Sequence, residues 1–349
     1  MNIIFDCERM KHPYTGLFEY CTQLGRALKA AAGTGNEMSF YIPPEYKNYF
    51  GSDSQYHIHL PVHKFIPLRV KQVDIWHSSN ARPAFVKSVR KMKRIITVHD
   101  LNFLYEKSSQ IKINRYLKAL QNSADRADAI ITISKYAKTD IVNHLKLNGK
   151  PVSVIYNGCN VLEFPAYDTP VYRPAAPFLF SIGTVVPKKN FHVLPCLLKN
   201  NGYELIIAGQ GKDGYVQKIV EEAKKHNVED RVKLTGPVKN EDKYWYLKNC
   251  SAFLFPSVAE GFGIPPIEAM HFGKPVFLST KTSLPEIGGQ YAYYFNDFEP
   301  ENICKAFETG MNHYAQTGQE SLIIKHAGQF NWEKSAGEYW EVYKSVLQI

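Results

Sequence analysis

The chain has little of what marks a secreted or membrane-spanning protein. Its 349 residues contain only six cysteines, which lie far apart and show no paired metal-ligand spacing. The longest apolar runs, such as residues 252–256, are far shorter than the roughly 20 residues that span a bilayer, and Met1 leads into an apolar strand rather than a signal peptide. We therefore expect a cytoplasmic protein with reduced thiols, without disulfides or a membrane span.

Negative charge is also in short supply. Lys and Arg number 42 against 33 Asp and Glu, which gives a formal net charge of +9 at pH 7 and favours anionic partners. The densest basic cluster contains no aromatic residues and does not resemble a platform for single-stranded nucleic acid. It comprises Lys87, Arg90, Lys91, Lys93 and Arg94. This cluster is either a solvated face or a contact to anionic lipid, and we expect no nucleic-acid partner.

Short β-branched runs alternate with amphipathic stretches along the whole chain. In the first half, strands are predicted at residues 2–6, 37–42, 74–77, 94–99 and 129–133. In the second half, they are predicted at residues 178–182, 203–208, 232–234, 252–255 and 275–278. Strands that alternate with helices predict an α/β protein with doubly wound, mostly parallel sheets.

A proline-rich stretch separates two such alternations. Residues 157–177 contain Pro165, Pro170, Pro174 and Pro177, which resist both helix and inner strand. The sequence thus predicts one domain at residues 1–165 and a second at 166–331. Residues 332–349 form a terminal amphipathic helix in this prediction, with aromatic residues spaced for burial.

The strongest chemical signal is the segment FPSVAEGFGIPPIEAM at residues 255–270, which runs from a strand through a glycine loop into a helix. Pro265 suits the first turn of that helix. Four loop amides should lie at the helix N-terminus, where phosphate or sugar oxygens bind well. They belong to Gly261, Phe262, Gly263 and Ile264. Glu260 and Glu268 flank them, and each carboxylate can accept hydrogen bonds from paired hydroxyls of a sugar or ribose.

This segment resembles the hallmark of the family-four retaining glycosyltransferases of the GT-B fold, two glutamates separated by seven residues. The similarity continues through residues 268–276 and 283–289. It implies two Rossmann-like domains facing an interdomain cleft, with the acceptor on the first and a nucleotide-sugar donor on the second. It also implies that Glu268 binds the ribose hydroxyls and Glu260 contacts the transferred sugar. The terminal helix is then expected to return to the first domain, although it could simply finish the second.

A second donor motif is SIGTVVPKKN at residues 181–190, predicted as a strand end, a loop and a helix start. A lysine here can neutralise the departing diphosphate. Gly183, Thr184, Lys188 and Lys189 are the candidates, with Lys189 as the catalytic cation and Lys188 as a substitute for the second cation that the family has in this loop. Many family members have arginine where this chain has Thr184. The loop resembles a subset associated with mannosyl transfer in bacterial surface-polysaccharide assembly, which implies GDP-mannose as donor; a UDP-sugar is the alternative.

The first domain contributes two further candidates. His99 lies at the end of the strand IITVHDL, where the family has a histidine near the transferred sugar. Gly16 begins a helix and would let backbone approach donor phosphate or sugar, although the family usually has a glycine pair there. Ser134, a predicted helix N-cap, and Asn157 are either structural or part of the site.

Three other functional classes fit part of the sequence. Gly209, Gly211 and Gly214 satisfy the dinucleotide fingerprint of a nicotinamide-dependent oxidoreductase. The strand that follows ends in Thr235-Gly236-Pro237, without the acid expected at its end, which argues against that interpretation. A nucleotide-sugar epimerase or a silent nucleotide-sugar-binding protein would share the substrate but transfer nothing.

The predicted reaction is retaining transfer of a hexose, preferably mannose, to a saccharide acceptor, which we expect to be lipid-linked. No carboxylate nucleophile is evident, and the resemblance implies front-face attack in which the leaving diphosphate accepts the proton of the acceptor. No acidic metal-binding motif is present, so neither metal nor another cofactor is expected. We expect a cytoplasmic enzyme, free or peripherally bound to the inner face of the membrane.

Overall fold

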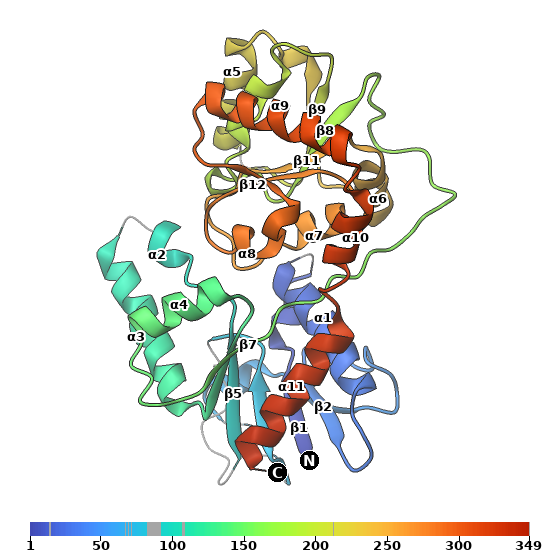
Figure 1. Cartoon of the computed structure of the whole chain (residues 1–349). Coiled ribbons are helices and arrows are strands. Elements are labelled where there is room, and N and C mark those ends of the chain that lie inside the picture. The colour runs from blue at the N-terminus through green and yellow to red at the C-terminus, as the bar shows by residue number, and fades with distance from the viewer. Residues whose placement is uncertain are drawn as a thin grey trace. The chain divides into compact units, whose positions relative to one another are not determined.

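The computed structural model describes the chain except for residues 14, 67, 69, 71, 82–91, 107–108, 212 and 349. It divides into two compact units, which are coloured by chain position in Figure 1. The first unit comprises Met1–Gly158 and Asn331–Ile349, and the second unit comprises Cys159–Phe330. Three of the five residues of the basic cluster, Lys87, Arg90 and Lys91, lie outside the described residues.

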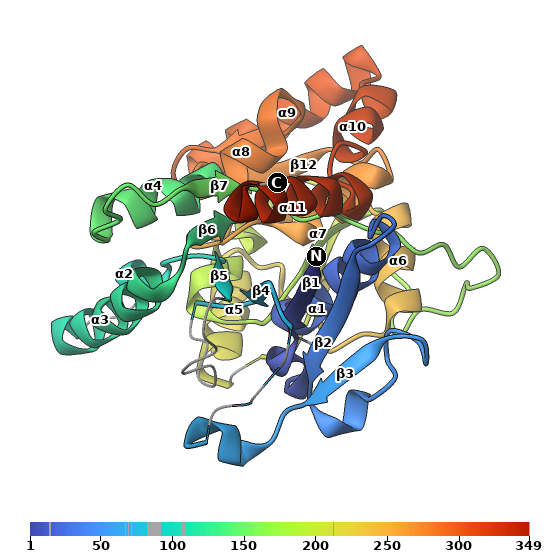
Figure 2. The ribbon, with the colours of Figure 1, turned by 90° about the horizontal axis from the view of Figure 1, so that it is seen from below.

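The first unit is built on a seven-stranded parallel sheet in the order β3-β2-β1-β4-β5-β6-β7, which can be followed strand by strand in Figure 2. Its strands are β1 Asn2–Asp6, β2 Glu37–Ile42, β3 Gln55–Ile58, β4 Ile75–Ser78, β5 Lys93–Val98, β6 Ala129–Thr132 and β7 Val152–Val154. In the central strand β1, Phe5 pairs with Phe40 on one side and His77 on the other. These central residues are completely buried, as expected for a parallel sheet covered on both faces.

Five α-helices accompany this sheet in the described part of the unit. They are α1 Gly16–Ala30, α2 Phe103–Glu106, α3 Gln110–Arg126, α4 Lys135–His144 and α11 Trp332–Leu347. The Ser134 side chain accepts a hydrogen bond from the backbone N–H of Ala137, which confirms the predicted N-cap of α4. Leu120 and Ala124 of α3 pack with Ile130 of β6 in one apolar cluster. The apolar face of α3 therefore packs against the sheet.

The terminal helix α11 is part of the first unit. His77 of β4 lies 2.7 Å from the Tyr343 hydroxyl and 2.8 Å from that of Thr97, and the Tyr20 hydroxyl lies 2.8 Å from that of Tyr339. The predicted aromatic stripe of α11 is buried at Trp332, Tyr339, Trp340 and Tyr343. A chain of buried polar side chains thus joins α11 to the sheet and to α1.

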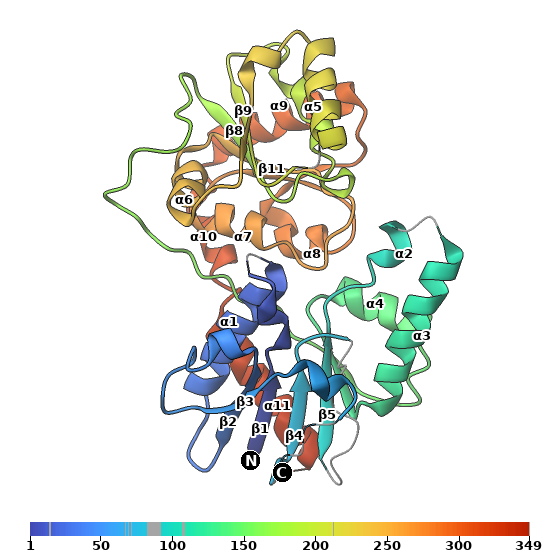
Figure 3. The same cartoon turned by 180° about the vertical axis from the view of Figure 1, so that it is seen from behind.

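The second unit contains a six-stranded parallel sheet in the order β10-β9-β8-β11-β12-β13. Its strands are β8 Phe178–Ile182, β9 Glu204–Ala208, β10 Val232–Gly236, β11 Ala252–Phe255, β12 Val276–Ser279 and β13 Tyr293–Phe295. Its α-helices are α5 Asp213–Lys225, α6 Asn240–Asn249, α7 Ile264–His271, α8 Leu284–Gly288, α9 Pro300–Thr317 and α10 Glu320–Ala327. Residues of α5 and α9 share one apolar core cluster with β8 and β9, and Figure 3 shows these two helices beside those strands.

The proline-rich stretch belongs to the second unit, so the chain leaves the first unit after Gly158 rather than at the predicted residue 165. The reason is a set of hydrogen bonds to buried carboxylates. Asp242 accepts from the Tyr167 hydroxyl at 2.5 Å and from the Val171 N–H at 2.8 Å, and Glu204 accepts from the Ala175 N–H at 2.6 Å. Prolines prevent regular structure here, but the side chains of the second unit still fix the path of the chain.

The sequence predicted reduced cysteines and no membrane span. All six cysteines are free thiols. Within the described residues, no helix has both the length and the apolar character needed to cross a bilayer.

Candidate active site

The order of strands in the second sheet explains where its site lies. From β8 the chain proceeds to β9 on one side and later returns to β11 on the other, so the topological switch point falls between β8 and β11. Ligands of open parallel sheets bind at the carboxyl ends of the strands at such a point. The loops that follow β8 and β11 carry the two predicted donor motifs, and the fold therefore brings these motifs together.

Lys189 and Glu260 meet at this switch point. The Lys189 Nζ lies 2.5 Å from Glu260 Oε1 and 4.7 Å from the centre of the Phe255 ring. Both side chains are mostly buried, with exposed fractions of 13% and 14%. The Lys188 carbonyl accepts hydrogen bonds from the N–H of Val258 at 2.8 Å and from the hydroxyl of Ser257 at 3.1 Å. The two loops are thus joined through backbone as well as through the ion pair.

The segment after Lys189 differs from the prediction. In place of an α-helix, the chain forms three short 3-10 helices, Pro187–Lys189, Phe191–Val193 and Pro195–Leu198. Pro187 and Pro195 supply no N–H for helical hydrogen bonds, and Asn190 has a left-handed backbone with φ 59°. Lys189 therefore lies at the end of a tight turn rather than in a helix.

The loop that carries Glu260 is held by the segment after β12. The Glu260 N–H donates to the Thr282 hydroxyl at 3.0 Å, and the Ser283 hydroxyl lies 2.7 Å from the Phe262 carbonyl oxygen and 3.2 Å from that of Glu260. Ser283 begins the motif SLPEIGG, so this motif supports the glutamate loop from outside. These hydrogen bonds hold the backbone of residues 260–262.

Helix α7 begins directly after this loop. Gly263 is its N-cap, with φ 122°, a conformation that favours glycine, and Pro265 lies in the first turn as predicted. Because Pro265 and Pro266 have no N–H, the amides at this helix start belong to Ile264 and the preceding loop residues. The predicted amide-lined corner is therefore formed by loop rather than by the helix interior.

Glu268 lies on α7 with only 6% of its surface exposed. Its Oε1 accepts hydrogen bonds from Lys243 Nζ at 2.8 Å and from the Tyr244 hydroxyl at 3.1 Å, both on α6. The sequence analysis did not single out Lys243 or Tyr244. Burial of Tyr244 follows from its place in an aromatic helix segment, but no sequence signal shows that α6 faces α7.

Two of the remaining donor candidates, Gly183 and Thr184, lie in the loop that follows β8. Gly183 has φ 149°, and a Cβ atom at this position would lie 3.3 Å from the Lys189 side chain. Thr184 is exposed in the same loop. A threonine at this position offers one hydroxyl and no charge, so Lys189 is the cation that the geometry places beside Glu260.

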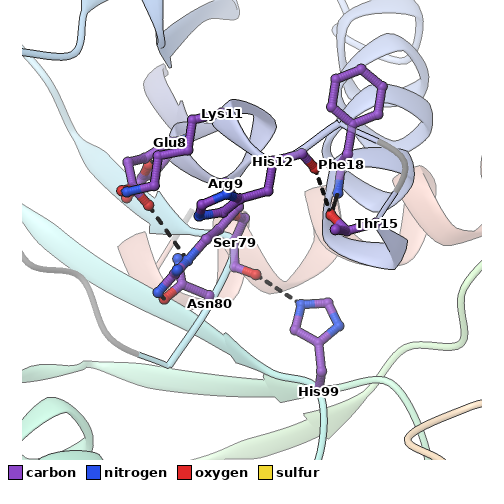
Figure 4. Close-up of polar contacts among 10 residues, drawn as sticks. Glu8, Arg9, Lys11, His12, Thr15, Phe18, Ser79, Asn80 and His99 are labelled. Carbon is purple, nitrogen blue, oxygen red and sulfur yellow. Dashed lines mark hydrogen bonds and ion pairs between the residues drawn. The ribbon is translucent and has the colours of Figure 1, made fainter. Parts of the chain in front are cut away.

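His99, labelled in Figure 4, and Gly16 belong to the first unit. The His99 Nε2 lies 2.8 Å from the Ser79 carbonyl oxygen, and its ring stands edge-on to Tyr20 at 4.6 Å between centres. Because a carbonyl can only accept, Nε2 carries the proton of this hydrogen bond. Burial lowers the pKa of His99, so the imidazole is neutral at pH 7, with Nδ1 as its acceptor. Gly16 is the first residue of α1, and a Cβ there would meet nothing within 4 Å.

A polar cluster that the sequence analysis missed lies at the switch point of the first sheet, between β1 and β4 (Figure 4). Arg9 Nε lies 3.4 Å from Glu8, Arg9 Nη2 lies 3.5 Å from Asn80, and Lys11 contacts Glu8. Asp6, at the end of β1, is buried, which raises its pKa to about 7. Each unit thus has charged side chains where its topology favours a ligand.

Comparison with known proteins decides the family. Residues 18–161 match the family model "Glycosyltransferase Family 4", and residues 172–313 match "Glycosyl transferases group 1". An uncharacterized glycosyltransferase of Methanocaldococcus jannaschii, MJ1178, is 30% identical over 78% of this chain and 76% of its own length. The chain belongs to the family-four glycosyltransferases. The predicted enzyme class is thereby confirmed.

Two further relatives extend this comparison. The glycosyltransferase is 26% identical to O-antigen chain mannosyltransferase B of Escherichia coli, over 99% of this chain and 100% of the relative. It also matches some longer mannosyltransferases of Escherichia coli, and it spans about a third of their length. The fold matches sucrose-phosphate synthase of Thermosynechococcus elongatus with a TM-score of 0.76 at 18% identity, over 100% of this chain and 99% of the other. The predicted GT-B fold is confirmed.

The dinucleotide-like glycines have a structural role in this glycosyltransferase. Gly209 has φ 139°, and a Cβ atom there would lie 1.9 Å from the Gly183 carbonyl oxygen. Gly211 forms an isolated parallel bridge with Val185. The loop after β9 therefore needs glycine because it packs against the backbone of the donor motif, and no pyrophosphate is required to explain it.

A metal site was not expected from the sequence. Within the described residues, no group of three or more His, Cys, Asp or Glu side chains is arranged to hold a metal ion. Metal independence stays a prediction.

Proposed function

We propose that this glycosyltransferase transfers mannose from GDP-mannose to a hydroxyl of a saccharide acceptor, with retention of the anomeric configuration. The single observation that carries the proposal is the ion pair of Lys189 with Glu260 at the switch point of the second sheet. It places a cation and a carboxylate beside the loop amides, one for a leaving diphosphate and one for a sugar hydroxyl.

The donor is bound in three parts under this proposal. Glu268 accepts hydrogen bonds from the ribose hydroxyls, Lys189 and the amides near Ile264 hold the diphosphate, and Glu260 accepts from a hydroxyl of the mannose. Gly183, Thr184 and Lys188 line the diphosphate in this proposal. The burial and ion pairing of both glutamates support this division, because an ion pair with a lysine orients each carboxylate.

Chemistry then follows by front-face attack. The bond between the mannose C1 and the diphosphate oxygen breaks while the acceptor oxygen forms its bond to C1 on the same face. The acceptor proton passes to the leaving diphosphate, whose negative charge Lys189 stabilises. No metal ion takes part in this proposal. His99 is neutral with its proton on Nε2, so its Nδ1 offers an acceptor that suits a sugar hydroxyl rather than a phosphate oxygen.

Mannose and GDP are supported by the loop at residues 183–190 and by the relative named as an O-antigen chain mannosyltransferase, at 26% identity. By the same likeness we assign the enzyme to assembly of a bacterial surface polysaccharide, with a lipid-linked saccharide as acceptor at the inner face of the cytoplasmic membrane. A UDP-sugar donor is the second candidate, since the shared donor loops bind ribose and diphosphate rather than base.

A calorimetric panel of GDP, UDP, GDP-mannose and UDP-glucose tests the donor. We expect the guanosine nucleotides to bind at least tenfold more tightly than their uridine counterparts. A preference for uridine would overturn the mannose assignment while leaving the glycosyltransferase class intact.

A further inference from the structure

We propose that Lys243 is a positioning residue for the donor, which holds Glu268 so that the second oxygen of its carboxylate binds the ribose hydroxyls and selects ribonucleotides. This inference rests on the proposed function, because it takes Glu268 as the ribose ligand. It adds a residue on another helix, outside both donor motifs, and a specificity that this residue controls.

Two hydrogen-bond donors converge on one carboxylate oxygen. Lys243 Nζ and the Tyr244 hydroxyl both contact Oε1 of Glu268, at 2.8 and 3.1 Å. Among the described residues, none donates a hydrogen bond to Oε2. A carboxylate accepts through both oxygens, so Oε2 retains its full capacity for a ligand that brings hydroxyl donors.

The two donors are themselves held in place. The Tyr244 hydroxyl lies 3.2 Å from the Asn160 carbonyl oxygen, and its ring packs 6.1 Å from that of Phe164 and 6.2 Å from that of Phe272. The Lys243 ammonium lies 4.3 Å from the centre of the Tyr244 ring, a cation–π contact. These contacts fix the positions of both donor side chains. The packing of the second unit therefore also sets the orientation of Glu268.

Lys243 also supplies the charge that Glu268 needs. Cys159 and His271 interact electrostatically with Glu268. Burial raises the pKa of the Cys159 thiol and lowers that of His271, and burial raises the pKa of Tyr244 as well, so all three are neutral at pH 7. Of the described groups that face the carboxylate, Lys243 is thus the one that carries a positive charge. A nearly buried carboxylate without a partner is strongly disfavoured.

The ligand chemistry makes this role measurable. Ribose presents two adjacent hydroxyls as donors, and hydrogen bonds to an ionised acceptor are stronger than those to a neutral one. A nucleotide without these hydroxyls cannot donate a hydrogen bond to Oε2, so the position of Oε2 does not affect its affinity. Lys243 should therefore matter for the ribonucleotide and be nearly irrelevant for its dideoxy analogue. A lysine that bound the diphosphate directly would instead strengthen both.

The experiment measures binding of GDP and of 2′,3′-dideoxy-GDP by calorimetry to the full-length enzyme and to Lys243→Met. The wild type should bind GDP at least tenfold more tightly than the dideoxy nucleotide. In Lys243→Met, GDP should bind about tenfold more weakly, with dideoxy-GDP changed by less than about twofold, so the preference collapses. Lys243→Arg, which keeps charge and donors, should restore most of it. If UDP is the better ligand, the uridine pair is used in the same way.

Lys248→Met is the matched control, because Lys248 is exposed on the same helix. It should keep the wild-type preference. A Lys243→Met variant that retains the preference, or that weakens both nucleotides equally, overturns the inference. Should Lys243→Met fail to fold, Tyr244→Phe removes the other donor to Oε1 and should reduce the preference in the same direction; an unchanged preference there would count against the inference. A wild type that binds both nucleotides equally would instead overturn the ribose assignment of Glu268 in the proposed function.

Discussion

Lys189 and Glu260 follow different strands, β8 and β11, and their charged groups lie 2.5 Å apart. The two residues are 71 positions apart in sequence. They meet because β8 and β11 are neighbours in the sheet. A diphosphate that binds here must compete with Glu260 for the lysine. Binding of the donor would then release one Glu260 oxygen for the sugar at the same moment.

The first prediction concerns Lys189. Lys189→Met should lower kcat at least about 100-fold, because the developing charge on the diphosphate loses its cation in a poorly solvated site. Release of GDP from GDP-mannose in the presence of acceptor measures the effect. Lys224→Met, on the exposed face of α5, serves as control and should behave as wild type. Wild-type kcat in Lys189→Met would remove this residue from the catalytic step.

The second prediction separates the two glutamates. Glu268→Ala should weaken GDP binding by about tenfold or more, since it removes the carboxylate proposed for the ribose. Glu260→Ala should leave GDP affinity within a few-fold and mainly lower kcat. Calorimetry with GDP and steady-state kinetics distinguish the two, with the exposed Glu229→Ala as reference. Equal effects of both substitutions on both measurements would contradict the assigned division of labour.

The third prediction concerns stereochemistry. The α-configured donor GDP-mannose should give an α-linked product, because attack and departure take place on one face of the sugar. The one-bond carbon–proton coupling at the anomeric centre of the purified product reports the configuration by NMR. A β-linked product would refute retention.

The fourth prediction concerns the stability of the first unit. Burial lowers the pKa of His77 to about 3 in the folded protein, against about 6.5 when unfolded. As the pH falls, the unfolded chain therefore binds a proton at His77 before the folded chain does. The free energy of unfolding is highest above about pH 6.5, and this titration lowers it as the pH falls toward 3. Between pH 7 and pH 5 this group alone should lower the free energy of unfolding by about 2 kcal/mol.

Chemical denaturation of wild type and His77→Gln at both pH values tests this prediction. Tryptophan fluorescence is a suitable signal, since Trp76, Trp332 and Trp340 lie in the first unit. The variant cannot titrate at this position and should lose about 2 kcal/mol less on acidification. Parallel losses in the two proteins would show that His77 is not the responsible group.

Central strands were predictable from sequence, whereas of the four edge strands only β10 was predicted. The predicted bounds of β1, β2, β8 and β11 agree with the structure because each is a short apolar run with both faces buried. Strands β3, β7 and β13 were missed. Residues such as His57 in β3 and Ser153 in β7 are only partly buried, so an edge strand lacks the continuous apolar run that marks a central one.

The sequence predicted the site residues that lie within one segment, but not the contacts between segments that are distant in sequence. The segment 255–270 contains Glu260, the glycine loop and Glu268 in one stretch, and their order alone indicates a ligand site. Lys243 and the cluster of Glu8, Arg9 and Asn80 depend on contacts between elements that are distant in sequence. Such contacts are set by packing of helices and strands, which local patterns do not encode.

Helix α11 determines when the first unit can finish folding during synthesis. The second unit is inserted between residues 158 and 331 of the first, so α11 leaves the ribosome after the whole second unit. Until that helix arrives, Tyr20 and His77 lack their partners Tyr339 and Tyr343. The half of the protein that is made first is therefore completed only after the second unit, and loss of α11 would remove partners from the N-terminal sheet rather than from the loops of Lys189 and Glu260.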